Sequence, residues 1–272
     1  MRRGSVVQWL AIIVLAAIIA VAVWFFVFER PARQQPAPIA SNPPPAAAAN
    51  TVPKHPVSSA NVPASATTAP LPTLPESDDS VLQALLALPG AQGLADLLVK
   101  QAIVPNIVAT VDALPRQSFG SARILPLRVP GGTFTVEQNG DRQVISAQNY
   151  GRYDAYMQVL ESVDSKALVA WYVRDYPLFQ QAYRDLGYPK GYFNDRLVAV
   201  IDNLLAAPEP AQPPAVQHQG AFYVYVDPAL ESLGAGQKML IHSGPRNEAR
   251  IKAKLREVRA LLVGQALPSG RS

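Results

Sequence analysis

Residues 6–28 read VVQWLAIIVLAAIIAVAVWFFVF, a stretch of 23 residues in which only Gln8 is plainly polar. A helix rises about 1.5 Å per residue, so this stretch would extend about 35 Å, enough to cross a hydrocarbon core of about 30 Å. It therefore predicts a single transmembrane helix, with the lipid bilayer as its partner. Residues 1–5 would form a short cytoplasmic N-terminus.

A cleaved signal peptide is the alternative interpretation of this stretch, because residues 20–22 offer an A-x-A cleavage site. The apolar run continues for six residues beyond that site, whereas the end of a signal peptide is polar. We therefore favour an uncleaved anchor.

Orientation depends on the cationic flanks, because positive charge stays on the cytoplasmic side. Arg2 and Arg3 precede the span, and Arg30 and Arg33 follow it, so the charge count alone is nearly balanced. The short N-terminal flank is the simpler one to keep inside. We expect a single-pass protein of the bacterial inner (cytoplasmic) membrane whose C-terminal domain is periplasmic.

A change of composition marks residues 29–75, which contain 12 Pro and 11 Ala but four charged residues. Proline removes backbone donors, and this stretch has few large side chains to bury. We expect a Pro/Ala-rich disordered tether. A spacer is the simpler role for it, and a role as a peptide ligand is the alternative.

The charge balance of the remaining chain argues against a nucleic-acid partner. Residues 76–272 carry 19 basic and 19 acidic groups, so they lack the basic footprint that nucleic acid requires. Residues 76–231 have a net charge of −6 and residues 232–272 a net charge of +6. The chain has no cysteine, which excludes disulfides and thiolate metal sites.

Hydrophobic periodicity predicts a mainly α domain with a small β component, an α+β fold, over residues 76–265, followed by a C-terminal tail at 266–272. Apolar residues at helical spacing, with caps and breakers, predict helices near 78–88, 91–100, 105–114, 153–160, 165–186, 192–205 and 245–263. Pro105 would be the first residue of its helix. Pro177 would kink the helix at 165–186 or divide it in two.

Alternating residues on both sides of Asn139 and Gly140 predict a β-hairpin with strands at 133–137 and 143–145, because both central residues of a type I′ turn need positive φ. Residues 123–129 would add a third strand, and residues 221–226 another. In the last helix, Ile251, Leu255, Val258 and Leu262 form one apolar stripe. We expect this helix to dock on the acidic body of the domain.

Three segments of the chain carry a family resemblance. They read VPNIVATVDALPR (104–116), YPLFQQAYRDLGYPKGYFNDRLVAVIDNLLAAPEP (176–210) and YVYVDPALESLGAGQKMLIHSGPRNEARIKAKLREVR (223–259). The chain resembles a bacterial domain-of-unknown-function family, number 3014. The resemblance implies one N-terminal span, a Pro-rich tether and a mostly helical domain, and it supplies no activity or catalytic residues.

Catalytic signals are scarce in this sequence. His55, His218 and His242 have no metal-ligand spacing, and no hydrolase, zincin, phosphate-loop or dinucleotide motif occurs. The glycines at 131–132 and 234–236 indicate a turn and a helix boundary rather than phosphate cradles. We therefore expect no catalytic, cofactor-binding or metal-binding residues.

The densest polar cluster lies between residues 172 and 185, where tyrosines offer a stacking face and a hydroxyl beside Arg and Asp. One interpretation is a sugar- or peptide-binding surface. The alternative, which we favour, is a helix with a Tyr-rich core stripe and solvated Arg/Asp pairs. Together with charged residues of later helices, the candidate interaction surface comprises Tyr172, Arg174, Asp175, Tyr176, Tyr183, Arg184, Asp195, Asp202, Arg250 and Lys254.

Location and the lack of motifs favour a non-enzymatic, membrane-tethered envelope protein that binds another envelope protein or the cell wall, that is, peptidoglycan. The alternative is a periplasmic hydrolase of peptidoglycan or a related substrate. Such an enzyme would need an acid–base pair, for which Glu161, Asp195 and Asp202 are the candidates.

Overall fold

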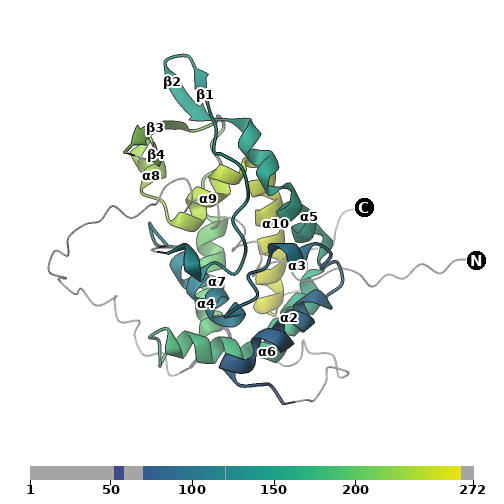
Figure 1. Cartoon of the computed structure of the whole chain (residues 1–272). Helices are drawn as coiled ribbons and strands as arrows, with labels where there is room; N and C mark the ends of the chain where they lie inside the picture. Colours follow the sequence, from purple (N-terminus) through teal and green to yellow (C-terminus); the bar gives the residue numbers. More distant parts are fainter. Residues whose placement is uncertain (1–51, 58–69, 120, 221, 265–272) are drawn as a thin grey trace, which may run out of the picture.

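A computed structural model describes residues 52–57, 70–119, 121–220 and 222–264 of the chain (Figure 1). The predicted span at 6–28, its flank at 1–5 and the tail at 266–272 lie outside these residues. No helix within the described ranges is both long and apolar enough to cross a bilayer.

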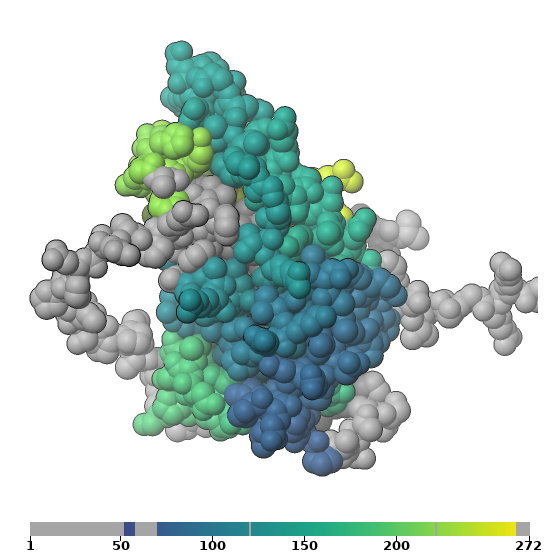
Figure 2. All heavy atoms as spheres, viewed as in Figure 1, coloured from purple at the N-terminus to yellow at the C-terminus, as the bar shows by residue number. Residues whose placement is uncertain are grey.

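A helical body carries a small sheet at one end, and the first hairpin of the sheet projects beyond the helices (Figures 1 and 2). The described α-helices are α2 (Asp78–Leu86), α3 (Leu94–Leu97), α4 (Ile103–Ala113), α5 (Asp154–Ser162), α6 (Ser165–Asp185), α7 (Phe193–Leu205), α8 (Pro228–Glu231), α9 (Ala235–Ser243) and α10 (Pro245–Leu262). Short 3₁₀ helices are η2 (Leu74–Glu76), η3 (Ala122–Ile124) and η4 (Ala147–Tyr153). The mainly α, minor β composition is confirmed.

The core lies where α10 packs against α6, α7 and α9. Ile251 and Leu255 have no exposed surface, and Val258 and Leu262 are also buried. Burying a side chain of this size stabilises a fold by about 1.5–3 kcal/mol. The prediction that the last helix docks on the body is confirmed.

The sheet contains four antiparallel strands in the order β1-β2-β3-β4. They are β1 (Val136–Asn139), β2 (Arg142–Ile145), β3 (Ala215–Gln219) and β4 (Phe222–Tyr225). The β1–β2 hairpin is confirmed, but its central residues are Gly140 and Asp141, because Asn139 pairs with Arg142. Only Gly140 has positive φ there, as a type II′ turn with glycine in its first central position requires, so the type I′ prediction was wrong.

Several local predictions need correction. Residues 123–129 form no strand; they contain the end of η3 and a single bridge from Leu127 to Leu98. Pro105 is the third residue of α4, where its missing N–H still has no intrahelical partner to lose. Helix α6 continues through Pro177 as one 21-residue helix, so the expected division does not occur.

The packed body begins before the predicted boundary at residue 76. Leu74 in η2 is buried in the main core, and Leu71 packs against that core from a partly buried position. These residues belonged to the predicted tether, which therefore does not extend freely up to residue 75.

Candidate functional site

A second piece of the predicted tether, residues 52–57, lies on the domain at the start of α7. Three hydrogen bonds hold its main chain. The Lys54 and His55 backbone N–H groups donate to the Asp195 carboxylate at 3.0 Å and 2.7 Å, and Asn194 Nδ2 donates to the His55 carbonyl oxygen at 2.8 Å. We call residues 52–57 the docked segment, and Asn194 with Asp195 the clamp.

The fold of α7 fixes the clamp in place. Phe193, the first residue of α7, is fully buried, and its N–H donates to Gln180 Oε1 on α6 at 2.9 Å. Asn194 is 1% exposed, and its Oδ1 accepts a hydrogen bond from the Tyr172 hydroxyl at 3.1 Å. That bond directs Nδ2 toward the docked segment. A carboxylate at the third helical position, such as Asp195, is also favoured by the helix dipole.

Two prolines frame the hydrogen bonds of the docked segment. Pro53 and Pro56 have no N–H, so Lys54 and His55 supply the donors between them, and both donors bind the clamp. Asp195 thus binds the backbone of the docked segment and not its side chains.

A small, mainly apolar pocket lies beside Val57, the last residue of the docked segment. Val57 lines it together with residues of α6, α7 and α10, namely Val169, Tyr172, Val173, Asn194, Leu261 and Leu262. The free space left among these side chains is ≈ 10 Å³, enough for at most one water. We call this site the three-helix pocket.

Part of the candidate surface predicted from sequence gathers around the clamp. Tyr172 is buried, and burial raises its pKa well above the ordinary value. Its ring meets the partly buried Tyr176 edge to face at 5.7 Å, and the Tyr176 hydroxyl donates to Gln180 at 2.8 Å. These tyrosines therefore support Asn194 and α7 from within, and their rings are not an open stacking surface.

The neighbouring residues of the predicted cluster point to other partners. The Arg174 guanidinium pairs with Asp175 at 2.6 Å, and burial raises the pKa of Asp175. Tyr183 is buried and stacks on Tyr188 at 4.6 Å, while Arg184 is exposed. The Tyr-rich core stripe considered as the alternative describes this part of α6 better than a sugar-binding face does.

The charged residues of later helices join elements of the body. Asp202 on α7 pairs with Arg259 on α10, and Arg250 pairs with Glu161 on α5. Lys254 Nζ donates to the Val163 carbonyl oxygen at 2.9 Å. These contacts fasten α10 to α5 and α7.

The three carboxylates considered for acid–base chemistry are not arranged as a pair. Asp195 binds the docked segment, Asp202 binds Arg259, and Glu161 binds Arg250. The Arg250 hydrogen bond and charge lower the pKa of Glu161, which favours its ionised form and opposes a role as general acid at neutral pH.

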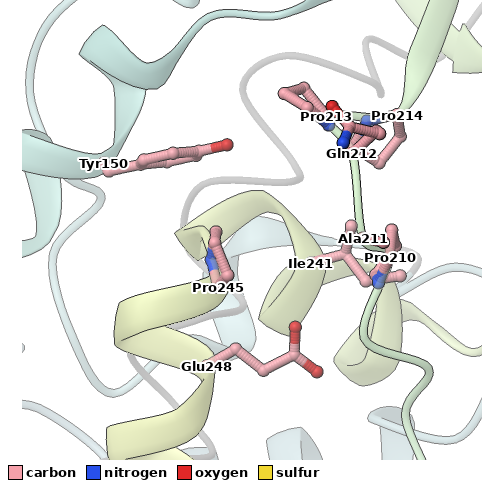
Figure 3. A pocket seen from close by; sticks show the side chains of 9 residues that line it. All are labelled: Tyr150, Pro210, Ala211, Gln212, Pro213, Pro214, Ile241, Pro245 and Glu248. Atoms are coloured by element: carbon pink, nitrogen blue, oxygen red, sulfur yellow. The ribbon is translucent and has the colours of Figure 1, made fainter.

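A second pocket lies where the Pro-rich segment 210–214 faces α9 and α10 (Figure 3). Tyr150 stands on its other side, and the Glu248 carboxyl lies at its base (Figure 3). Burial raises the pKa of Glu248, and Lys252, 2.9 Å away, opposes that rise. The cavity of ≈ 70 Å³ has room for a few waters and is too small for a typical organic ligand.

The histidines lie in three separate elements: His55 in the docked segment, His218 in β3 and His242 in α9. Burial and the nearby Lys238 lower the pKa of His242 to about 3, so it is neutral at physiological pH. In the described part of the chain, no three His, Asp or Glu side chains come together in a way that could hold a metal ion.

Sequence reasoning selected Asp195 and Tyr172 but missed Asn194 and the docked segment. A usable signal was present, because Pro53 and Pro56 form a P-x-x-P spacing, a common feature of segments bound by other domains. The peptide-ligand alternative for the tether pointed in this direction.

A family model described as "Protein of unknown function (DUF3014)" matches residues 103–259. This range contains α4 to most of α10, and so includes the clamp and the second pocket. Of the three-helix pocket it includes the residues from α6 and α7 but not Val57, Leu261 or Leu262. Neither the curated proteins nor the solved structures yield a match to the chain.

Proposed function

This chain belongs to the DUF3014 family of proteins of unknown function, and we propose that it is a non-enzymatic, membrane-tethered envelope protein that binds a short segment of a partner polypeptide. The observation that carries the proposal is the clamp, which holds one carbonyl and two N–H groups of a main chain. Main-chain hydrogen bonds provide affinity in many peptide-binding domains, and side-chain pockets provide specificity.

The proposed location rests on the sequence. The apolar residues 6–28 support anchoring in the bilayer, and Arg2 and Arg3 support an N-terminus in the cytoplasm. Under this proposal the clamp faces the periplasm of a bacterial cell, where its partner is another envelope protein. The neutral charge of residues 76–272 argues against nucleic acid as that partner.

Binding in trans should be weak. Each of the three hydrogen bonds is worth about 0.5–1.5 kcal/mol net, and burying Val57 adds about 1.5–3 kcal/mol at most. These gains total about 3–7.5 kcal/mol, and association itself costs several kcal/mol, so a dissociation constant on the order of 1 mM or weaker follows.

The test uses the full-length chain in detergent with residues 52–57 replaced by GSGSGS, which removes both prolines and Val57 and increases the backbone entropy lost on docking, so the linked segment competes less for the clamp. A fluorescent peptide with the sequence of residues 51–58 should bind saturably, as measured by anisotropy, and mass spectrometry should find it uncleaved. Asp195→Asn in the same background should weaken binding at least tenfold, because the amide presents only one acceptor. Asp202→Asn, on the same helix, is the matched control.

Three outcomes would contradict the proposal: no specific binding up to about 20 mM peptide, equal binding by the Asp195→Asn chain, or cleavage of the peptide. A second measurement is independent of the replacement. In the unmodified chain, hydrogen exchange at Lys54 and His55 should be slowed, and Asp195→Asn should restore rapid exchange.

A further inference from the structure

Resting on the proposed function, we propose that the clamp selects Pro-x-x-Pro segments followed by a small apolar residue, and that residues 52–57 are a built-in competitor for partner segments of this chemistry. The proposal starts from the one ligand seen on the clamp, which reads VPKHPV. Its partner would be a polypeptide with an exposed Pro-rich stretch.

The prolines limit both the conformations and the donors of this ligand. Pro53 and Pro56 have φ fixed near −65°, and the residues before them, Val52 and His55, are restricted to extended conformations. Four of the six positions are therefore restricted before binding, which lowers the entropy lost on docking. Only two N–H groups remain between the prolines, and both meet Asp195.

The residue after the second proline provides the side-chain contact. The partly buried Val57 lines the three-helix pocket, where ≈ 10 Å³ of free space remains. This space holds at most one water, so the pocket has little enclosed room for a side chain as large as phenylalanine. The exposed Lys54 side chain has no such pocket, so the position between the prolines tolerates substitution.

Covalent linkage makes the docked segment a competitor. Twelve residues, 58–69, join it to the start of the packed body at residue 70. A short linker of this kind gives an effective concentration on the order of 1 mM. For a dissociation constant of about 1 mM, the docked segment occupies the clamp about half of the time, which weakens binding of an equivalent partner segment by about twofold.

The test compares four peptides on the full-length chain carrying GSGSGS at 52–57: the native sequence of residues 51–58, a Pro53→Ala/Pro56→Ala double variant, Lys54→Ala and Val57→Ser. We expect the double proline variant to bind at least tenfold more weakly and Val57→Ser about fivefold more weakly. Lys54→Ala should stay within about twofold. The unmodified chain should bind the native peptide about twofold more weakly than the replaced chain.

Failure of this inference is distinguishable from failure of the proposed function. If the double proline variant binds as tightly as the native peptide while Asp195→Asn still abolishes binding, the clamp reads any main chain and the selectivity is refuted. Equal binding of the native peptide by the unmodified and replaced chains would refute the claim that residues 52–57 compete with partner segments. Binding of none of the peptides would instead overturn the proposed function. The unmodified chain could instead self-associate, and the replacement could abolish this self-association. That result would mean that residues 52–57 bind the clamp of a second copy, and it would refute the proposal of a different partner polypeptide.

Discussion

Replacing Lys252 by methionine should destabilise the domain by about 3–5 kcal/mol at pH 7 and by about 2 kcal/mol less at pH 5. Lys252 lies on α10 and is 2% exposed. Its ammonium group lies 2.6 Å from the Ala207 carbonyl oxygen, 2.7 Å from Glu209 Oε1 and 2.9 Å from Glu248 Oε1. Methionine fills a similar space, so the change removes the charge and its hydrogen bonds but little packing.

The three oxygens contribute unequally to this loss. The Glu209 side chain is 60% exposed, so water replaces the ammonium at little cost. The buried Ala207 carbonyl would lose a donor, which costs about 1–3 kcal/mol. Glu248 is buried and would carry an unpaired charge, which it avoids by taking up a proton.

Protonation of Glu248 makes the penalty depend on pH. Burial already raises the pKa of Glu248 above 4.5, and Lys252 lowers it, so removing Lys252 raises it further. A carboxyl whose pKa is raised in the folded state loses stability as pH rises from its unfolded pKa to its folded pKa. A Glu248 that stays protonated in the folded state costs about 1.36 kcal/mol for each pH unit above its ordinary pKa of 4.5. This cost is at most about 3.4 kcal/mol at pH 7 but only about 0.7 kcal/mol at pH 5.

Urea unfolding of the full-length chain in one detergent measures the free energy of unfolding at pH 5 and at pH 7, and so gives the loss caused by Lys252→Met at each pH. Arg256→Met, an exposed change on the same helix, is the control and should have little effect. Glu248→Gln combined with Lys252→Met should recover most of the loss at pH 7 and remove its pH dependence. A loss below 1 kcal/mol for Lys252→Met, or an equal loss at both pH values, would refute the reasoning.

Leu255→Ala should cost about 2–5 kcal/mol, because Leu255 is fully buried, and should lower the melting temperature by about 2–4 °C per kcal/mol; an unchanged melting temperature would mean that α10 is not core. Gly244→Ala should destabilise the domain by more than about 1 kcal/mol in urea unfolding, because φ is 88° and the added Cβ would lie 2.6 Å from the Tyr150 ring. A C-terminal alkaline phosphatase fusion should be active if residues 29–272 are extracytoplasmic. An inactive phosphatase together with a bright cytosolic fluorescent reporter would reverse the orientation.

Helices with long apolar stripes could be predicted from the sequence, because the spacing of their apolar residues indicates which helix face is buried. Helices α7 and α10 follow their predicted ranges closely for this reason. Strand β3 was missed because one of its five residues, Val216, is buried, and the strand exists through pairing with β2 and β4. Pro177 did not divide α6, because burial of Tyr172 before it and of Phe179 after it holds the helix together despite the lost hydrogen bond.

The site was less readable because it joins residues that are far apart in the chain. Lys54 and Asp195 are separated by 141 positions, and no local pattern reports such a contact. Composition identified Tyr172 and Asp195 as chemically suitable, and helical periodicity placed Tyr172 in a core stripe, but neither indicated which side chain Tyr172 supports. Tyr172 is buried and holds the Asn194 amide, so it acts on the ligand through another side chain.

Docking of residues 52–57 has a consequence for the proposed membrane anchor, because the same residues serve as ligand and as tether. With the segment docked, 23 residues separate the end of the span from the domain, and they reach at most about 80 Å. With the segment displaced, residues 29–69 become available, and the limit rises to about 145 Å. A partner segment that takes the clamp would therefore also lengthen the distance over which the domain can move from the membrane, and binding would favour partners farther from the bilayer.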